Sequence, residues 1–393
     1  MFARFRANVW KIYLFRFFGS LHFIGGVLVP FFTDWAGINF TQIMILQSWF
    51  MLWIFLLEIP SGAAADYLGR KHTLVLACGV SAIGAVVYSS TPNFYLFLLG
   101  EMLFAVSQAL LSGSTEAFVY DTLKIVGQAK KSKEVFGRAE SFGLAGIMIG
   151  APLGSIIAAT IGLRAPMLLH AVPSTIGLFV ALTFSEPEQT EEVQKKRYTS
   201  ILKDGVRYFR RNRILKILAL DMIVIASIAY FMIWFYQPML EQAGIDIAYF
   251  GAVHAALAVS QIVIMNNYGR LENLFGSKKR LISLSAIITG VVFIIGGLTT
   301  FIPVVVLVII LGGGFGLSRR PLFVSYMNRY IPSSERATVL STISMFRRFS
   351  LVAVNPVIGI IADWSLNYTL VILGATAILF SLISRVQEEY LID

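Results

Sequence analysis

Ten residues in the first third of the chain, GAAADYLGRK at positions 62 to 71, carry the pattern that decides the fold. A degraded copy, GRLENLFGSK, follows at positions 269 to 278, so that Asn273 stands 207 residues after Asp66. Each copy lies between the second and the third long apolar segment of its half of the chain. Such an internal repeat predicts two structurally similar halves.

Twelve apolar segments surround the two copies, six before a polar stretch and six after it. Each is long enough to cross a bilayer, and a lone segment in lipid must be a helix to satisfy its backbone hydrogen bonds. The sequence therefore predicts an all-α integral membrane protein with twelve transmembrane helices in two pseudo-symmetric six-helix bundles. The predicted spans are residues 10–32, 40–62, 72–90, 94–120, 137–161, 165–184, 214–240, 245–267, 281–300, 303–327, 338–362 and 367–384.

The composition supports a membrane protein. Of the 393 residues, 57% are hydrophobic and 14% are charged, against about 45–50% and about 25% in soluble domains. A soluble fold cannot bury this much apolar surface, so a soluble enzyme is excluded and we expect no enzymatic activity. We read the net charge of +10 as a signal of orientation in the bilayer and expect no binding to nucleic acid.

The basic residues predict the orientation. With the N-terminus inside, 31 of the 32 Lys and Arg residues fall on the cytoplasmic side, and Arg164 alone falls outside. An even number of spans returns the chain to its starting side. We therefore expect a multi-pass protein of the plasma (inner) membrane with both termini in the cytoplasm.

The polar stretch divides the chain into three parts. Residues 1–184 and 214–393 are the predicted bundles, and 185–213 is a predicted cytoplasmic linker. Within it, Tyr198–Arg211 is either an amphipathic helix on the inner leaflet or a solvated charged loop.

The repeated motif resembles the loop signature G-x-x-x-D-x-x-G-R-[KR] of the major facilitator superfamily, and the resemblance covers essentially the whole chain. It implies two bundles related by a pseudo-twofold axis, a central substrate cavity and alternating access. The motif residues are implied to latch one bundle to the other at the cytoplasmic surface; alternatively, its basic residues only anchor the chain. The second copy has Asn273 in place of the acid, which disfavours a symmetric second latch. The implied latch residues are Gly62, Asp66, Gly69, Arg70 and Lys71.

Acidic residues gather in the fourth predicted span. If this span is one continuous helix, Gln108 and Glu101 lie within a narrow arc of its surface, and Glu116 lies at the edge of that arc. Asp121 lies near the cytoplasmic end of the helix. We take the three acids as candidates for proton coupling and Gln108 as a substrate contact. For Glu101 the alternative is a structural pair with a base such as Arg16, or a buried hydrogen bond. His22, in the first span, is either a substrate contact or a packed hydrogen-bonding residue.

Basic residues gather in the other half. Arg320 and Arg347 could hold a carboxylate or phosphate by bidentate hydrogen bonds; alternatively, they pair with acids of the first bundle. Tyr230, Trp234 and Gln237 share one helix face and are candidate substrate contacts, although a lone aromatic residue in a membrane helix usually packs or faces lipid.

These features favour a secondary active transporter of a small molecule, since no phosphate-binding loop for ATP occurs. The leading hypothesis is proton-coupled efflux of amphipathic compounds, and the rival is transport of an anionic or zwitterionic metabolite. A non-transporting receptor or a lipid scramblase of the same fold is a third reading. The four histidines have no metal-ligand spacing, so we expect neither a metal nor a cofactor. We expect a monomer in the lipid bilayer.

Overall fold

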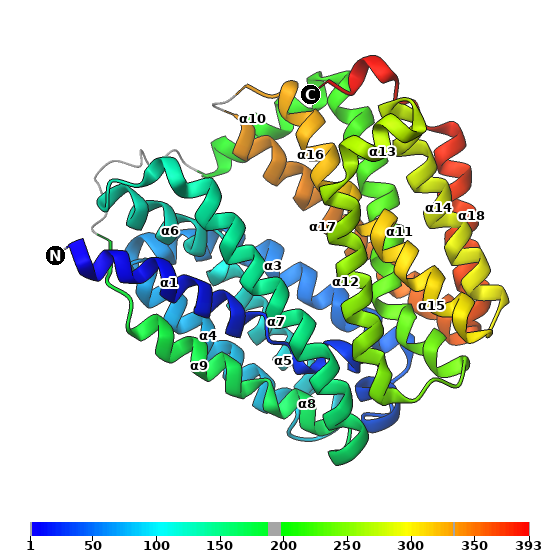
Figure 1. Ribbon diagram of the computed structural model, residues 1–393, viewed down its shortest axis with the longest axis horizontal. Helices are drawn as coiled ribbons and strands as arrows, with labels where there is room; N and C mark the ends of the chain where they lie inside the picture. Colours follow the sequence, from blue (N-terminus) through cyan, green and yellow to red (C-terminus); the bar gives the residue numbers. More distant parts are fainter. Residues whose placement is uncertain (1, 188–197, 333–334, 393) are drawn as a thin grey trace. The chain divides into compact units, whose positions relative to one another are not determined.

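The computed structural model describes residues 2–187, 198–332 and 335–392. Throughout this part of the chain, every regular element is a helix (Figure 1). The α-helices are α1 (Phe2–Gly19), α2 (Leu28–Pro30), α3 (Phe40–Leu68), α4 (Arg70–Tyr88), α5 (Phe94–Leu111), α6 (Ser114–Ile125), α7 (Ser132–Ile161), α8 (Arg164–Leu169), α9 (Ala171–Leu182), α10 (Tyr198–Arg211), α11 (Arg213–Gln242), α12 (Phe250–Asn266), α13 (Tyr268–Phe275), α14 (Lys278–Leu298), α15 (Ile302–Leu311), α16 (Arg319–Arg329), α17 (Arg336–Trp364) and α18 (Leu366–Ile383). Short 3-10 or π turns are η1 (Phe23–Gly26), η2 (Phe31–Trp35), η3 (Ala129–Lys131), η4 (Ile247–Tyr249), η5 (Gly312–Leu317) and η6 (Glu388–Tyr390).

The membrane-spanning character is confirmed. Eleven helical segments among the described residues are long and apolar enough to cross a bilayer. A twelfth span arises if the bent pair Arg4–Gly26 and Leu28–Trp35, which turns by 63°, is counted as one. The predicted all-α class with twelve spans is therefore correct, and the first span differs from expectation only in being sharply bent.

The chain forms two compact units. The first comprises Met1–Val193 with Ile247–Ala255, and the second comprises Gln194–Asp246 with Ala256–Asp393. Part of the predicted linker, residues 188–197, lies outside the described residues. The rest of the linker includes α10, which spans the predicted amphipathic segment and packs against α17 of the second unit.

In the first unit, close packing depends on glycines of α7. An added Cβ at Gly146 would lie 2.4 Å from the carbonyl oxygen of Phe17, and one at Gly154 would lie 1.6 Å from that of Phe23. With Gly150 between them, these glycines recur every four residues, and small residues at this spacing let helices approach closely in a membrane. This glycine stripe, Gly146, Gly150 and Gly154, therefore lets α7 pack against α1 and against the turn that follows α1.

In the second unit, α14 and α18 run side by side (Figure 1). A Cβ at Gly290 would lie 2.6 Å from the carbonyl oxygen of Gly374, and a Cβ at Gly374 would lie 2.4 Å from that of Gly290. The two backbones thus touch at a pair of glycines. The apolar core beside them joins α11, α14, α16 and α17 to the chain after α18, where Val386 and Leu391 are buried.

Two of the later spans are interrupted. The fourth span breaks between α5 and α6, where Ser112 is extended and Gly113 has a φ of +74°. The tenth span widens into the π turn η5 (Gly312–Leu317), and four of the six residues of this turn are glycines. Irregular backbone at membrane depth persists only where protein covers it or where it lines a cavity. The break in the fourth span is the one that leads to the candidate site.

Candidate functional site

The first unit contains a polar cavity of about 370 Å³. Its walls come from α1 and the turn after it, from α4, from both halves of the broken fourth span (α5 and α6), and from α7. The residues of the break, Leu111, Ser112 and Gly113, are themselves part of the lining. Non-helical backbone in this span therefore has the function that membrane proteins usually give it, which is to open helix ends and side chains toward a cavity.

One ion pair crosses the cavity wall. Arg16 of α1 donates to the carboxylate of Glu140 of α7, and both residues line the cavity. The alternative in which Arg16 pairs with Glu101 is therefore wrong, because the partner of Arg16 is Glu140. The pair fixes α1 to α7 just where the glycine stripe brings them together.

Three predicted site residues meet in this cavity: His22, Gln108 and Glu116. The His22 ring stacks on that of His170, with centroids 4.8 Å apart. Gln108 and Glu116 are exposed to the cavity, and within the described residues neither side chain has a hydrogen-bond or ion-pair partner. Polar groups without protein partners on a cavity wall are the groups that are free to contact a solute.

Glu101 lies elsewhere in the first unit. It is 7% exposed, and its carboxylate accepts hydrogen bonds from Gln47 Nε2 and from Tyr88 OH, both at 2.9 Å. It is not part of the cavity lining. Glu101 and Gln108 both lie on α5, but seven residues separate them by roughly 10 Å along the helix axis, so a shared face does not bring Glu101 to the cavity. The break at Gly113 separates only Glu116, on α6, from the arc expected for one continuous helix. These contacts match the alternative in which Glu101 forms buried hydrogen bonds. A role of Glu101 in proton coupling stays a prediction.

The predicted latch surrounds the turn between α3 and α4. Gly69 has a φ of +89°, a conformation that favours glycine. The backbone amides of Arg70 and Lys71 donate to the two carboxylate oxygens of Glu186, at 2.7 and 2.8 Å. Arg70 Nε also lies 4.0 Å from Asp121 Oδ2, so the acid predicted for proton coupling lies beside the latch.

Two other latch residues give less information. The side chain of Asp66 lies outside the described part of the structure. At Gly62, no described neighbour lies within 4 Å of the position of an added Cβ. The latch itself, which concerns two bundles, stays a prediction.

The second copy of the motif has the same backbone device. Gly276 ends α13 with a φ of +82°, and Ser277 caps α14 by accepting from the amide of Arg280 at 3.2 Å. The amides of Lys278 and Lys279 donate to the carboxylate of Glu388 at 3.0 and 2.8 Å. In each half, therefore, an acid that follows the sixth span caps the third span, where it complements the positive end of the helix dipole.

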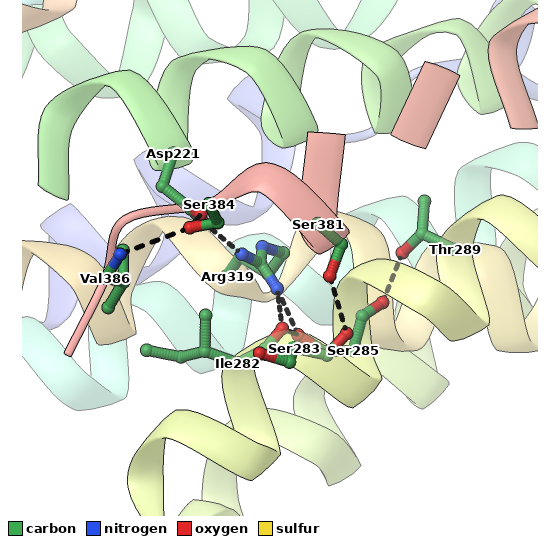
Figure 2. Close-up of polar contacts among 9 residues, drawn as sticks. All are labelled: Asp221, Ile282, Ser283, Ser285, Thr289, Arg319, Ser381, Ser384 and Val386. Atoms are coloured by element: carbon green, nitrogen blue, oxygen red, sulfur yellow. Dashed lines mark hydrogen bonds and ion pairs between the residues drawn. The ribbon is translucent and has the colours of Figure 1, made fainter. Parts of the chain in front are cut away.

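A buried ion pair organises the second unit (Figure 2). Arg319 Nη2 donates to Asp221 Oδ1 at 2.6 Å, and Nη1 donates to the carbonyl oxygen of Ile282 at 2.5 Å and to Ser285 Oγ. Ser384 Oγ donates to Asp221 Oδ2 at 2.6 Å. Arg319 and Asp221 are 1% and 4% exposed. The network joins α11, α14, α16 and the chain after α18, so Arg319 is a structural residue.

The neighbouring basic candidates differ from Arg319. Arg320 is exposed and Arg347 is half-buried, and Arg347 lies within electrostatic range of Arg320, Arg348 and Tyr230. Within the described residues, no carboxylate forms an ion pair with Arg320 or Arg347. Arg320 and Arg347 are thus two positive charges of the second unit that no described acid of that unit neutralises.

The three residues of α11 predicted to contact the substrate have different surroundings. The Tyr230 and Trp234 rings contact each other with centroids 6.4 Å apart, and the buried indole Nε1 of Trp234 has no described hydrogen-bond partner. Gln237, by contrast, is buried and donates to Tyr236 OH at 2.9 Å. Tyr230 and Trp234 are therefore better placed than Gln237 to contact a ligand.

Sequence reasoning missed Asp221, Glu186 and Glu388. The two glutamates could have been found, because each follows its half's last apolar segment by only a few residues. Asp221 could have been found as the only acid in the apolar run 214–240. No group of three or more described His, Cys, Asp or Glu side chains is placed to hold a metal.

Solved structures share this fold. The crystal structure of nucleoside transporter NupG matches with a TM-score of 0.79 at 12% identity, over 95% of this chain and 97% of that one. A bacterial homolog of the human lysosomal transporter Spinster, in an inward-facing and occupied conformation, matches with a TM-score of 0.72 at 14% identity, over 98% and 94% of the two chains. At such identities the likeness concerns the fold alone.

Sequence comparisons agree. A glucose/galactose transporter of Brucella abortus biovar 1 (strain 9-941) is 22% identical over 192 residues, and the match spans 46% of this chain and 46% of that relative, less than half of its length. An uncharacterized MFS-type transporter of Bacillus subtilis (strain 168), YxaM, is 21% identical over 367 residues, 89% of each chain. The family profile described as Major Facilitator Superfamily matches residues 12–354 and 222–389. Since that match covers most of the twelve-span chain, the protein belongs to the major facilitator superfamily and is a secondary transporter of the membrane, not an enzyme.

Proposed function

We propose that this chain transports a small hydrophilic metabolite with an anionic group, alone or as part of a zwitterion, by alternating access. The observation that carries the proposal is the cavity at the broken fourth span, where the polar side chains of Gln108 and Glu116 have no described protein partner. Both groups are exposed to the cavity, so a lipophilic cargo would remove their water without replacing its hydrogen bonds, which is costly. The Glu116 carboxylate favours the zwitterionic form of such a metabolite, because it can pair with the cationic group. The volume of about 370 Å³ suits a metabolite of modest size.

The comparisons favour the same class of cargo. The names of two similar proteins mention glucose or galactose and nucleosides, which are small hydrophilic molecules. The uncompensated arginines of the second unit add the preference for an anionic group, since a guanidinium recognises carboxylates and phosphates by paired hydrogen bonds.

The second candidate is proton-coupled efflux of amphipathic compounds. Glu101 supports it, since a carboxyl buried in a membrane protein often takes part in proton movement. The ring pair of Tyr230 and Trp234 would suit an apolar cargo. We also propose that H⁺ is the coupling ion, that the protein is a monomer, and that it lies in the plasma membrane with both termini in the cytoplasm.

Proteoliposomes under an imposed pH gradient test these proposals. The probes are radiolabelled glucose, uridine, lactate and glutamate, together with the lipophilic cation tetraphenylphosphonium. We expect flux of a hydrophilic probe that Glu116→Gln and Gln108→Ala reduce. Glu134→Gln is the control, because Glu134 forms an exposed i,i+4 pair with Arg138, which contributes little, and does not line the cavity.

The outcomes separate the candidates. Tetraphenylphosphonium flux that depends on the pH gradient and survives Arg320→Ala and Arg347→Ala would favour amphipathic efflux and contradict the metabolite proposal. Loss of the pH dependence in Glu101→Gln would support proton coupling through that residue. If no probe is transported and the variants Glu101→Gln and Glu116→Gln behave as wild type, the results would favour a non-transporting receptor or a lipid scramblase.

A further inference from the structure

We propose that Arg320 and Arg347 in the second unit, with Trp234, form a subsite for the carboxylate or phosphate of a solute that also presents a flat apolar surface. The subsite lies wholly within the second unit, where α16 and α17 supply the charges and α11 supplies the rings. This inference rests on the proposed function and names the chemistry of its cargo.

The charges are the first argument. Arg347 is half-buried, yet the charged side chains within its electrostatic range include Arg320 and Arg348. Like charges at this depth raise the free energy of the protein unless an anion offsets them. The adjacent Arg319 shows how the protein compensates a buried arginine, because Asp221 forms an ion pair with it at 2.6 Å. Among the described residues, no such acid serves Arg320 or Arg347, so the compensating anion is best supplied by a ligand.

Unused hydrogen-bond donors are the second argument. Ser227, Tyr230 and Trp234 occur at i, i+3 and i+7 on α11 and therefore share one face of it. Ser227 Oγ and Trp234 Nε1 are buried and have no hydrogen-bond partner in the described part of the chain. Tyr230 connects this face to the arginines, because it lies within electrostatic range of Arg347. Buried donors are nearly always satisfied, so unsatisfied ones on one face indicate an acceptor that arrives from outside.

The set of groups defines the ligand. Guanidiniums and the indole N–H only donate, so together they repel a cation and suit an oxygen-rich anion. The Tyr230 and Trp234 rings lie 6.4 Å apart, and Tyr230, which is only half-buried, provides an aromatic edge or face that a ring of the solute can contact. A carboxylate or phosphate attached to a flat ring therefore fits better than a bare inorganic anion or a neutral sugar.

Calorimetric titration of the purified full chain in nanodiscs tests the subsite. The probes are phenyl phosphate and benzoate, with benzyl alcohol as the neutral and benzylamine as the cationic counterpart. We expect only the two anions to bind. Arg320→Gln and Arg347→Gln should each weaken their binding about tenfold or more, because each removes a charged hydrogen bond.

Further variants separate binding from folding. Arg329→Gln is the matched control, since Arg329 is an exposed arginine at the end of the same helix, α16. Arg347→Lys keeps the charge without the paired donors and should bind with intermediate affinity even if Arg347→Gln does not fold. Trp234→Phe keeps a ring, loses the N–H and should weaken binding severalfold.

Three results would overturn the proposal: equal binding of benzyl alcohol and benzoate, full affinity in both Arg→Gln variants, or loss of the probe's binding when the nanodisc contains anionic lipid. The last result would assign the arginines to a lipid headgroup instead of a solute. Because binding is measured without flux, the subsite and the transport function can fail separately. Anion binding without any flux would leave the subsite standing and remove the transport proposal.

Discussion

Arg319 and Arg320 are neighbours in the chain whose side chains have opposite environments. Arg319 is 1% exposed and makes hydrogen bonds to Asp221, Ile282 and Ser285, while Arg320 is exposed and has no described ion pair. Successive residues of a helix point about 100° apart. One arginine can therefore stabilise the bundle while the other stays available to a ligand.

Replacing Asp221 with Asn should destabilise the protein strongly. Arg319 would keep its charge inside the second unit after losing its counter-ion, and breaking a buried pair from one side costs about 3–5 kcal/mol. We expect a clear fall in the thermal unfolding midpoint of the detergent-purified protein. Glu389→Gln, which removes an exposed carboxylate of the same unit, should leave the midpoint unchanged.

The double variant Asp221→Leu with Arg319→Met makes this test sharper. It removes both charges and fills the space with apolar atoms, so it should recover part of the stability that Asp221→Asn loses. A wild-type midpoint in Asp221→Asn would show that the ion pair in Figure 2 does not stabilise the folded state.

At the residue scale, the sequence predicted which residues carry charge in the membrane but not all of their partners. His22, Gln108 and Glu116 do line one cavity. Glu101 does not, although it shares α5 with Gln108, because it lies two turns away and is covered by Gln47 and Tyr88. Helical spacing predicts which residues share a face, but not how far along that face a cavity extends.

Among the helices, α7 is the element with the least tolerance for added volume. At Gly154, a Cβ would lie 1.6 Å from the carbonyl oxygen of Phe23, and backbone cannot move aside cheaply. Gly154→Ala should therefore lower the yield of monodisperse protein and its thermal midpoint. Gly137→Ala is the matched control in the same helix, where nothing described lies within 4 Å of the new Cβ. It should be neutral or stabilising by up to about 1 kcal/mol, since alanine is the better helix former. Equal midpoints for the two variants would contradict close packing along α7.

The cap of α14 makes stability depend on pH. Burial alone would raise the pKa of Glu388, but hydrogen bonds from the amides of Lys279 and Lys278 and from Ser277, with the charge of Lys278, hold that pKa below its ordinary value. A carboxyl with a lowered pKa in the folded state stabilises that state above the pKa it has when unfolded. This contribution disappears as the pH falls through the folded-state pKa.

Glu388→Gln should therefore have a lower thermal midpoint than wild type at neutral pH, and the difference should shrink toward strongly acidic pH. The effect should be small, because the carboxyl is largely exposed to solvent. Gln387→Ala, at the exposed preceding position, should show no such pH dependence. A constant difference between Glu388→Gln and wild type at all pH values would mean that the carboxylate charge is not what stabilises the cap.

Span positions could be predicted well because hydrophobic length is a property of local sequence, and bilayer thickness sets it. The interruptions could not. The bend of 63° in the first span and the π turn at η5 depend on how neighbouring helices pack, which no single segment encodes. The capping by Glu186 and Glu388 likewise joins residues 116 and 110 positions apart in the chain.

At the scale of the whole molecule, charge is the feature that sets orientation. Of the 32 Lys and Arg residues, all except Arg164 fall on the side predicted to be cytoplasmic, and the side with more basic residues stays inside during insertion. Arg164 has a structural role of its own, since its Nε donates to the carbonyl oxygen of Ser89 at 2.7 Å. Its predicted place on the outer side therefore does not weaken the charge rule.

The single cysteine makes this orientation directly measurable. Cys78 is buried, so Cys78→Ser gives a background into which one reporter cysteine can be placed. Thr91→Cys lies in the exposed turn between α4 and α5, and Gln387→Cys lies in the exposed segment after α18; neither change alters the charge pattern. In intact cells, a membrane-impermeant maleimide should label Thr91→Cys but not Gln387→Cys, and permeabilised cells should show labelling of both. The Cys78→Ser parent reports background reaction in each case. Labelling of Gln387→Cys alone in intact cells would place the basic face outside. Labelling of both would contradict the predicted topology, because nine spans are predicted between the two positions and an odd number of spans places them on opposite sides of the membrane.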